Sequence, residues 1–195
     1  SAFRLLVSIL TPGSPTNTKV VAVFCYLTVE KNLEVALEKY VTEYEYHPDI
    51  EKLRELLSKV TDEQKLNILQ QTKCWWSDRT ALQVAADRGD AEMISTILSS
   101  LQSSDRLKLL MMRDHWKCTP LHRAASEDHT ESAKAILNSL TADQQMQLLP
   151  VEDVDGETAE ETASGKTANL LSKYKNRARE KADPGELIPL HSHVM

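Results

Sequence analysis

The segment "TPLHRAASEDHTESAKAILNSL", residues 119–140, decides the fold because the chain contains it twice. Residues 80–101, "TALQVAADRGDAEMISTILSSL", align with it without a gap, so that the threonine, the Ala-Ala pair, a glutamate and the Ile-Leu pair fall in step. The two segments lie 39 positions apart, and a shorter copy, "TAEETASGKTANLLSKY", begins another 39 positions on. Self-similarity at a fixed period indicates a repeat architecture in which each unit packs on the next.

Each copy has the apolar pattern of two helices. In the first copy, one stripe ends at the break "RGD", residues 88–90, and a second stripe follows, formed by Met93, Ile94, Ile97 and Leu98. In the second copy, Thr119 followed by Pro120 is a favoured helix start, an N-cap residue followed by proline at the first helical position. The small side chains of the Ala-Ala pair allow stacked helices to approach closely.

The connectors between the copies predict a third, short helix. Residues 61–64, "TDEQ", and residues 141–144, "TADQ", have the capping-box pattern, and apolar residues follow each of them. Five glycines and 5% aromatic residues argue against a turn-rich β-sandwich or barrel. The sequence therefore predicts an all-α helical repeat solenoid with a 39-residue period and short extra helices between the repeats.

Residues 114–137, "DHWKCTPLHRAASEDHTESAKAIL", resemble the ankyrin repeat, whose pattern is D-x-x-G-x-T-P-L-H-x-A-A-x-x-G-H-x-E-I-V-x-x-L-L. The matching residues are Asp114, Thr119, Pro120, Leu121, His122, Ala124, Ala125, His129, Glu131 and Leu137. The resemblance covers roughly residues 66–174 and implies about three repeats. Lys117 and Asp78 replace the hairpin glycine, and the period exceeds the family's value of about 33 residues. The resemblance implies a non-catalytic protein–protein interaction module.

In this family, hairpin positions and the exposed turn of the first helix contact partners. Carried over by position, the implied partner-binding residues are Trp75, Trp76, Ser77, Arg79, Asp87, Arg88, His115, Trp116, Cys118, Ser126 and Glu127. The tryptophans can be binding anchors, since tryptophan is enriched in hot spots, or they can fold back over the neighbouring connector helix as packing residues. We expect a folded or helical protein partner of unknown identity. A net charge of −6 gives no support for nucleic-acid binding.

Residues 164–167, "SGKT", raise the alternative of a nucleotide-binding protein, because they match the end of a phosphate-binding loop. The first glycine of the motif G-x-x-x-x-G-K-[ST] falls on Glu160, however, and the preceding residues are acidic and lack the apolar run of a buried strand. We therefore predict that Ser164-Gly165 forms the corner of a truncated terminal repeat, followed by a second helix over residues 166–172.

A second alternative is a zinc-stabilised module. It would use His115, Cys118, His122 and His129, but their spacing matches none of the familiar structural zinc pairs. The resemblance instead implies that His122 hydrogen-bonds to neighbouring backbone. The sequence contains no nucleophile–base motif, no H-E-x-x-H and no glycine-rich dinucleotide loop. We therefore expect no enzymatic activity, no cofactor and no metal.

The chain divides by composition into four parts. Residues 29–60 predict a divergent capping helix pair, residues 61–175 the repeats, and residues 176–195 a disordered tail. Residues 1–28 stay unassigned, because their apolar run "VVAVFCYLTV" fits either a strand or a buried helix. The basic run "KYKNRAREK", residues 173–181, fits an anionic-partner or nuclear-import patch, or simply complements a helix dipole.

Cysteine content and hydropathy bear on the location of the protein. Three scattered cysteines are too few for a disulfide framework, which predicts a reducing, cytoplasmic environment. The most apolar run has ten residues, whereas a membrane-spanning helix needs about 20, so we expect no membrane insertion. We expect a monomer. Because the chain begins at Ser1 rather than methionine, we also expect a fragment of a larger multidomain protein.

Overall fold

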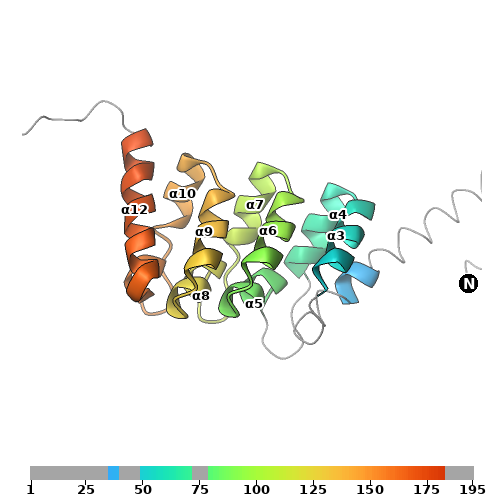
Figure 1. Cartoon of the computed structure of the whole chain (residues 1–195), viewed down its shortest axis with the longest axis horizontal. Helices are drawn as coiled ribbons and strands as arrows, with labels where there is room; N and C mark the ends of the chain where they lie inside the picture. Colours follow the sequence, from blue (N-terminus) through green and yellow to red (C-terminus); the bar gives the residue numbers. More distant parts are fainter. Residues whose placement is uncertain (1–34, 40–48, 72–78, 183–195) are drawn as a thin grey trace, which may run out of the picture.

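The structure is a computed structural model that describes residues 35–39, 49–71 and 79–182 (Figure 1). Its named helices are α3 (Ile50–Lys59), α4 (Asp62–Gln71), α5 (Ala81–Asp87), α6 (Ala91–Ser99), α7 (Ser103–Leu110), α8 (Pro120–Ser126), α9 (Thr130–Asn138), α10 (Ala142–Leu148), α11 (Ala159–Thr162) and α12 (Gly165–Ala182). Residues 35–39 are also helical. The described residues form no strand, only an isolated antiparallel bridge between Glu152 and Thr158. The predicted all-α repeat solenoid is confirmed.

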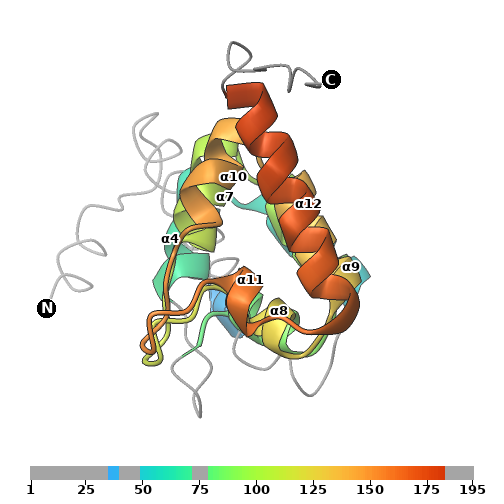
Figure 2. The ribbon, with the colours of Figure 1, turned by 90° about the vertical axis from the view of Figure 1, so that its left-hand side faces the viewer.

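The helices pack in three parallel rows along the solenoid. The first row contains α5, α8 and α11, the second α3, α6, α9 and α12, and the third α4, α7 and α10. Viewed from the end of the stack, the three rows lie at the corners of a triangle (Figure 2). Helices α5 and α8 begin at Ala81 and Pro120, 39 positions apart, and α7 and α10 begin at Ser103 and Ala142, with the same offset. The third row consists of the connector helices that the sequence predicts.

The helix starts follow from their capping residues. The hydroxyls of Thr80, Thr119 and Thr141 each accept the backbone N–H of the residue three positions on. The side chain of that residue in turn accepts the backbone N–H of the threonine. Thr61 makes the same reciprocal pair with Gln64. Such pairs satisfy two N–H groups that a helix start would otherwise leave without partners.

The core runs between the rows as one continuous cluster. Each full repeat contributes the Ala-Ala pair from its first-row helix and an Ile-Leu pair from its second-row helix, and all are at most 1% exposed. Fully burying a leucine or isoleucine side chain stabilises a fold by about 1.5–3 kcal/mol. Stability is therefore distributed along the stack, with each repeat covering an apolar face of the next.

Cations of the third row connect neighbouring repeats. The Lys65 ammonium of α4 donates to the carbonyl oxygen of Ser100 at 3.3 Å, and the Arg106 guanidinium of α7 donates to that of Ser139 at 3.2 Å. Ser100 and Ser139 are the C-cap residues of α6 and α9. Each cation thus satisfies a terminal carbonyl of the next repeat and complements the negative end of its helix dipole.

The last helix corrects the predicted domain boundary. Helix α12 continues to Ala182, so residues 176–182 belong to the final helix and not to a disordered tail that begins at residue 176. Leu171, Tyr174 and Ala178 follow each other at helical spacing and are buried where α12 packs on α9 and α10. The Tyr174 hydroxyl donates to Asn138 Oδ1 at 2.5 Å. The elongated helix covers the side of α10 that another repeat would otherwise cover.

Parts of the sequence-based assignment lie outside the described residues. These are the unassigned segment 1–28, much of the capping pair, and residues 183–195. Among the helices that are described, none is both long and apolar enough to cross a membrane.

Candidate protein-interaction surface

An aspartate shapes each of the two described hairpins. Asp114 Oδ1 accepts the backbone N–H groups of Trp116 and Cys118 at 2.9 and 3.0 Å. In the next repeat, Asp153 Oδ1 accepts those of Asp155 and Glu157 at 2.9 and 3.1 Å. A short acidic side chain that binds the backbone two residues on stabilises a tight turn, which is why aspartate suits this position.

Contacts between the two hairpins hold their tips side by side. The backbone N–H of Val154 donates to the carbonyl of Trp116 at 3.0 Å. The Arg113 guanidinium donates to the carbonyl of Lys117 at 2.9 Å and also to the carbonyl of Glu152 on the neighbouring hairpin. The tips therefore form a continuous surface.

Two large apolar side chains lie at this surface. Trp116 is 52% exposed and Val154 is 48% exposed, whereas most other large apolar side chains among the described residues are buried. The His115 and Trp116 rings are in tilted contact, with centroids 4.8 Å apart. Of the two roles that the sequence leaves open for Trp116, this exposure favours a binding anchor.

The tip of the middle hairpin is conformationally strained. Lys117 has a φ of 57°, and Gly156, at the same position of the last hairpin, has a φ of 82°. Residues with a Cβ atom lose about 1–2 kcal/mol in left-handed backbone, whereas glycine does not. Lysine thus replaces the hairpin glycine without changing the shape of the turn.

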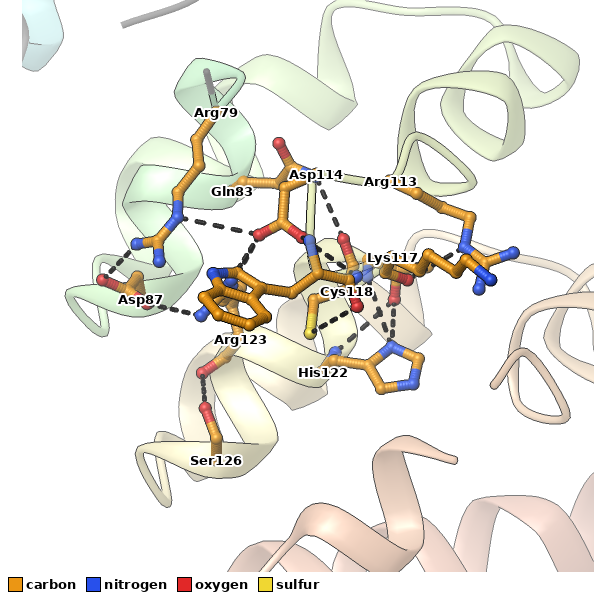
Figure 3. A network of polar contacts seen from close by, with 12 residues as sticks. Arg79, Gln83, Asp87, Arg113, Asp114, Lys117, Cys118, His122, Arg123 and Ser126 are labelled. Carbon is orange, nitrogen blue, oxygen red and sulfur yellow. Dashed lines mark hydrogen bonds and ion pairs between the residues drawn. The ribbon is translucent and has the colours of Figure 1, made fainter. Parts of the chain in front are cut away.

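A buried charge network lies behind the hairpin (Figure 3). The carboxylate of Asp114, whose side chain is fully buried, accepts the Arg123 guanidinium, including Nε at 2.9 Å, and lies 3.7 Å from Arg79 Nε. Arg79 also donates to Asp87 at 3.0 Å, and Arg123 lies 3.9 Å from Asp87. The network joins two repeats.

The structure separates the predicted partner-binding residues into groups. Trp75, Trp76 and Ser77 lie outside the described residues. His115, Trp116 and Cys118 come together on the middle hairpin, and Arg88, Ser126 and Glu127 are exposed at the C-terminal ends of α5 and α8. Arg79 and Asp87 pair with each other in the network behind the hairpin.

The residues considered for zinc have other roles. His122 Nε2 bonds to the carbonyl of Glu157 at 3.2 Å, and His129 Nε2 bonds to the carbonyl of Asp87 at 3.1 Å. Burial raises the pKa of the Cys118 thiol, which keeps it protonated and makes it a poor metal ligand. Within the described ranges, no three His, Cys, Asp or Glu side chains are placed to hold a metal ion together.

The "SGKT" segment starts a helix that a carboxylate of the chain itself caps. Asp128 Oδ1 accepts the backbone N–H of Thr167 at 3.0 Å, and its carboxylate lies so close to Gly165 that an added Cβ atom would be 2.7 Å away. Gly165 also has a φ of 56°. The glycine is therefore explained by the turn and by the contact with Asp128. An amide that already binds a carboxylate is not available to a phosphate group, which argues against the nucleotide-binding alternative.

We predict that Asp128→Gly lowers the melting temperature by a few degrees, even though glycine suits the φ of 53° at this position. The hydrogen bond to Thr167 lowers the pKa of Asp128 below its ordinary value of 3.8. A carboxyl group with a lowered pKa contributes stability above its unfolded-state pKa, and this contribution is lost as the pH falls through the folded-state pKa. Thermal unfolding at pH 7 and pH 3 therefore checks the prediction. The difference between variant and parent should shrink at pH 3, and an equal difference at both pH values would contradict it.

The comparison with known families decides the classification. The family described as ankyrin repeats, in three copies, matches residues 43–148, which is more than half of the chain. The chain belongs to the ankyrin-repeat family. The match includes α3, which sequence analysis assigned to a divergent capping pair, and it ends with α10, before the truncated last copy.

The comparison with solved structures gives a distant similarity. A chain of the crystal structure of the yeast ribosomal protein Rps3 in complex with its chaperone Yar1 has 15% sequence identity and a TM-score of 0.46. The similarity covers 80% of this chain and 94% of that chain. No curated protein matches the sequence significantly.

Two residues of the ankyrin hairpin surface are not evident from the sequence alone. Val154 lies in an acidic segment and belongs to no apolar stripe, so no periodicity marked it as part of a surface cluster with Trp116. Lys117 was visible as a departure from the ankyrin glycine, but only the positive φ shows that the lysine is held in a conformation that glycine adopts at lower cost.

Proposed function

We propose that this ankyrin chain is a non-catalytic module that binds a protein partner through its hairpin tips and the exposed ends of its first-row helices. The observation that carries the proposal is the exposure of Trp116, which is 52% exposed at a hairpin tip. Its backbone carbonyl accepts a hydrogen bond from the backbone N–H of Val154. Exposed tryptophan is uncommon, and tryptophan is enriched among residues that dominate binding energy. Ankyrin-repeat membership supports the same function class.

The proposed contact residues fall into two sets. His115, Trp116 and Cys118 supply the hairpin contacts, and Arg88, Ser126 and Glu127 supply the helix-end contacts. Arg79 and Asp87 support the hairpin from behind through the charge network. We further propose that the module is a monomer and that it is cytoplasmic, a location that the low and scattered cysteine content supports.

Trp116→Ala is expected to leave the melting temperature nearly unchanged and to weaken partner binding by at least about 2 kcal/mol, or roughly 30-fold. The stability should persist because about half of the residue is already in water. The measurement compares thermal unfolding with quantitative capture of cellular proteins on immobilised parent and variant.

Lys108→Ala is a surface control, because Lys108 is exposed on α7, where it pairs with Asp105 of the same helix, and is not among the proposed contact residues. Proteins that bind through the proposed surface should be lost from the Trp116 variant and retained by the Lys108 variant. If Trp116→Ala melts several degrees earlier, the indole is a packing residue, and the proposal loses its main support.

A further inference from the structure

Two described residues other than glycine have left-handed backbone, Lys117 and Asp128. The same positions in a neighbouring repeat hold Gly156 and Gly89, with φ values of 82° and 77°. Glycine adopts this conformation at lower cost than any residue with a Cβ atom. A side chain that replaces glycine here should therefore contribute something that offsets the strain.

The side chain of Asp128 offsets the strain through contacts with other residues of the same chain. Its carboxylate accepts the backbone N–H of Thr167 and packs against Gly165 at the start of α12. The neighbouring turn, at Gly89, has no carboxylate and instead packs against the ring of His129. Asp128 thus shows that a residue with strained backbone in a turn of this protein can have a side chain that stabilises the fold.

No comparable role is found for the Lys117 side chain among the described residues. Its carbonyl accepts Arg113, but a glycine would supply the same carbonyl. Its ammonium group is exposed and makes no hydrogen bond or ion pair with the described residues. Among the described residues, the ammonium of this strained lysine therefore has no anionic partner at the hairpin tip, beside Trp116.

We propose that Lys117 recognises a carboxylate of the protein partner, while Trp116 and Val154 receive a bulky apolar side chain next to it. The ligand is thus a protein segment in which an aspartate or glutamate lies near a large apolar residue. The proposal rests on the interaction function proposed above and specifies the chemistry of its partner. The carbonyls of Lys117 and Glu152 already hold the Arg113 guanidinium, which leaves the ammonium of Lys117 as the available cation on the two described hairpins.

The charges of the next hairpin limit the choice of ligand. Glu152, Asp155 and Glu157 are exposed there, beside Val154. A single carboxylate can pair with Lys117 while the rest of the segment crosses this acidic hairpin with neutral or basic residues. A nucleic-acid strand carries a phosphate at every nucleotide and would be repelled along the same path.

The test uses a library of random 12-residue peptides, selected on the full chain and measured individually by fluorescence anisotropy. We expect the selected peptides to carry an acidic residue within one or two positions of a bulky apolar residue. Binding should weaken about five- to tenfold in Lys117→Gly, and change less in Lys117→Arg, which keeps the charge. Replacing the acidic residue of the peptide by its amide should weaken binding to the parent but not to Lys117→Gly.

Lys117→Gly also separates binding from folding, because it installs the residue of the neighbouring hairpin. Its melting temperature should be no lower than that of the parent while its affinity falls, a combination that a purely structural role of the lysine would not give. Equal peptide binding by parent and Lys117→Gly overturns the inference, as does a failure to select any peptide. Tighter binding of a 12-nucleotide oligouridine than of the peptides at physiological salt overturns it as well.

Sensitivity to Trp116→Ala distinguishes the two proposals. Peptides that require Trp116 but ignore Lys117 would leave the proposed function intact and refute the carboxylate recognition. Peptides that ignore both residues would place binding elsewhere and refute both.

Discussion

Asp114→Ala is expected to destabilise the fold by about 3–5 kcal/mol, because it removes the anion from a buried charge network. The Asp114 side chain is fully buried, and the side chains of its partners Arg79 and Arg123 are only 16% and 14% exposed. Without the carboxylate, two mostly buried cations share the single remaining carboxylate of Asp87. The backbone N–H groups of Trp116 and Cys118 also lose their acceptor.

Asp153→Ala is the matched control for this prediction. Asp153 accepts two backbone N–H groups in the same geometry at the last hairpin, but it makes no ion pair with the described residues. Its loss should cost about 2 kcal/mol, because each of its two hydrogen bonds contributes about 1 kcal/mol. The free energies of unfolding of both variants, measured by urea denaturation, separate the contribution of the charge network from that of the turn. Equal destabilisation would mean that the ion pairs add nothing to the hairpin.

Much of the fold could be predicted from the sequence because its signals are local or periodic. The 39-residue self-similarity sets the offset between equivalent helices, and the threonine capping boxes mark where first-row and third-row helices begin. The end of the last helix could not be predicted in this way. The repeat pattern stops before Ala178, and it does not show that Ala178 is buried where α12 packs on α9 and α10.

The candidate site was less predictable, because its key contacts join residues far apart in the sequence. Arg79 and Asp114 are 35 positions apart, and neither their spacing nor their types indicates that they pair. Arg79 and Asp87 thus looked like exposed contact residues. The "SGKT" segment posed the same difficulty: Gly165 is next to Asp128, which lies in the preceding repeat and occupies the place where a phosphate would be expected.

Lowering the pH from 7.5 to 5 is expected to destabilise the protein through His122, and His122→Gln should reduce this effect. His122 Nδ1 accepts the backbone N–H of Thr119 at 3.3 Å, so the ring proton is on Nε2, which donates to the carbonyl of Glu157 at 3.2 Å. Protonation of Nδ1 would replace this acceptor with a second donor. Burial, the main cause, lowers the pKa of His122 below its ordinary value of 6.5.

The sign of the pH effect follows from this lowered pKa. The folded state favours the neutral imidazole, so its contribution is fully present above the unfolded-state pKa of 6.5 and is lost as the pH falls through the folded-state pKa. Asp128 and Glu161, whose pKa values are lowered from 3.8 and 4.5, stay ionised between pH 7.5 and 5. They do not obscure the histidine effect in this range.

Gln83 shows that glutamine can replace His122 in its structural role. One repeat earlier, its side-chain oxygen accepts the backbone N–H of Thr80 at 2.8 Å, and its Nε2 donates to the carbonyls of Met112 and Cys118, each at 3.1 Å. His122→Gln should thus keep most of the stability at pH 7.5. His122→Ala should lose about 1–3 kcal/mol, because it leaves the buried backbone N–H of Thr119 without its acceptor.

Thermal unfolding of the parent and His122→Gln at half-unit steps from pH 7.5 to 5 measures the effect. The parent should lose stability more steeply below pH 6.5, and the difference between the two curves isolates His122, because the other histidines are present in both proteins. Parallel curves would contradict the prediction and would mean that the buried ring accepts a proton without cost. A steeper loss in the glutamine variant would mean that the folded state stabilises the imidazolium, which contradicts a lowered pKa of His122.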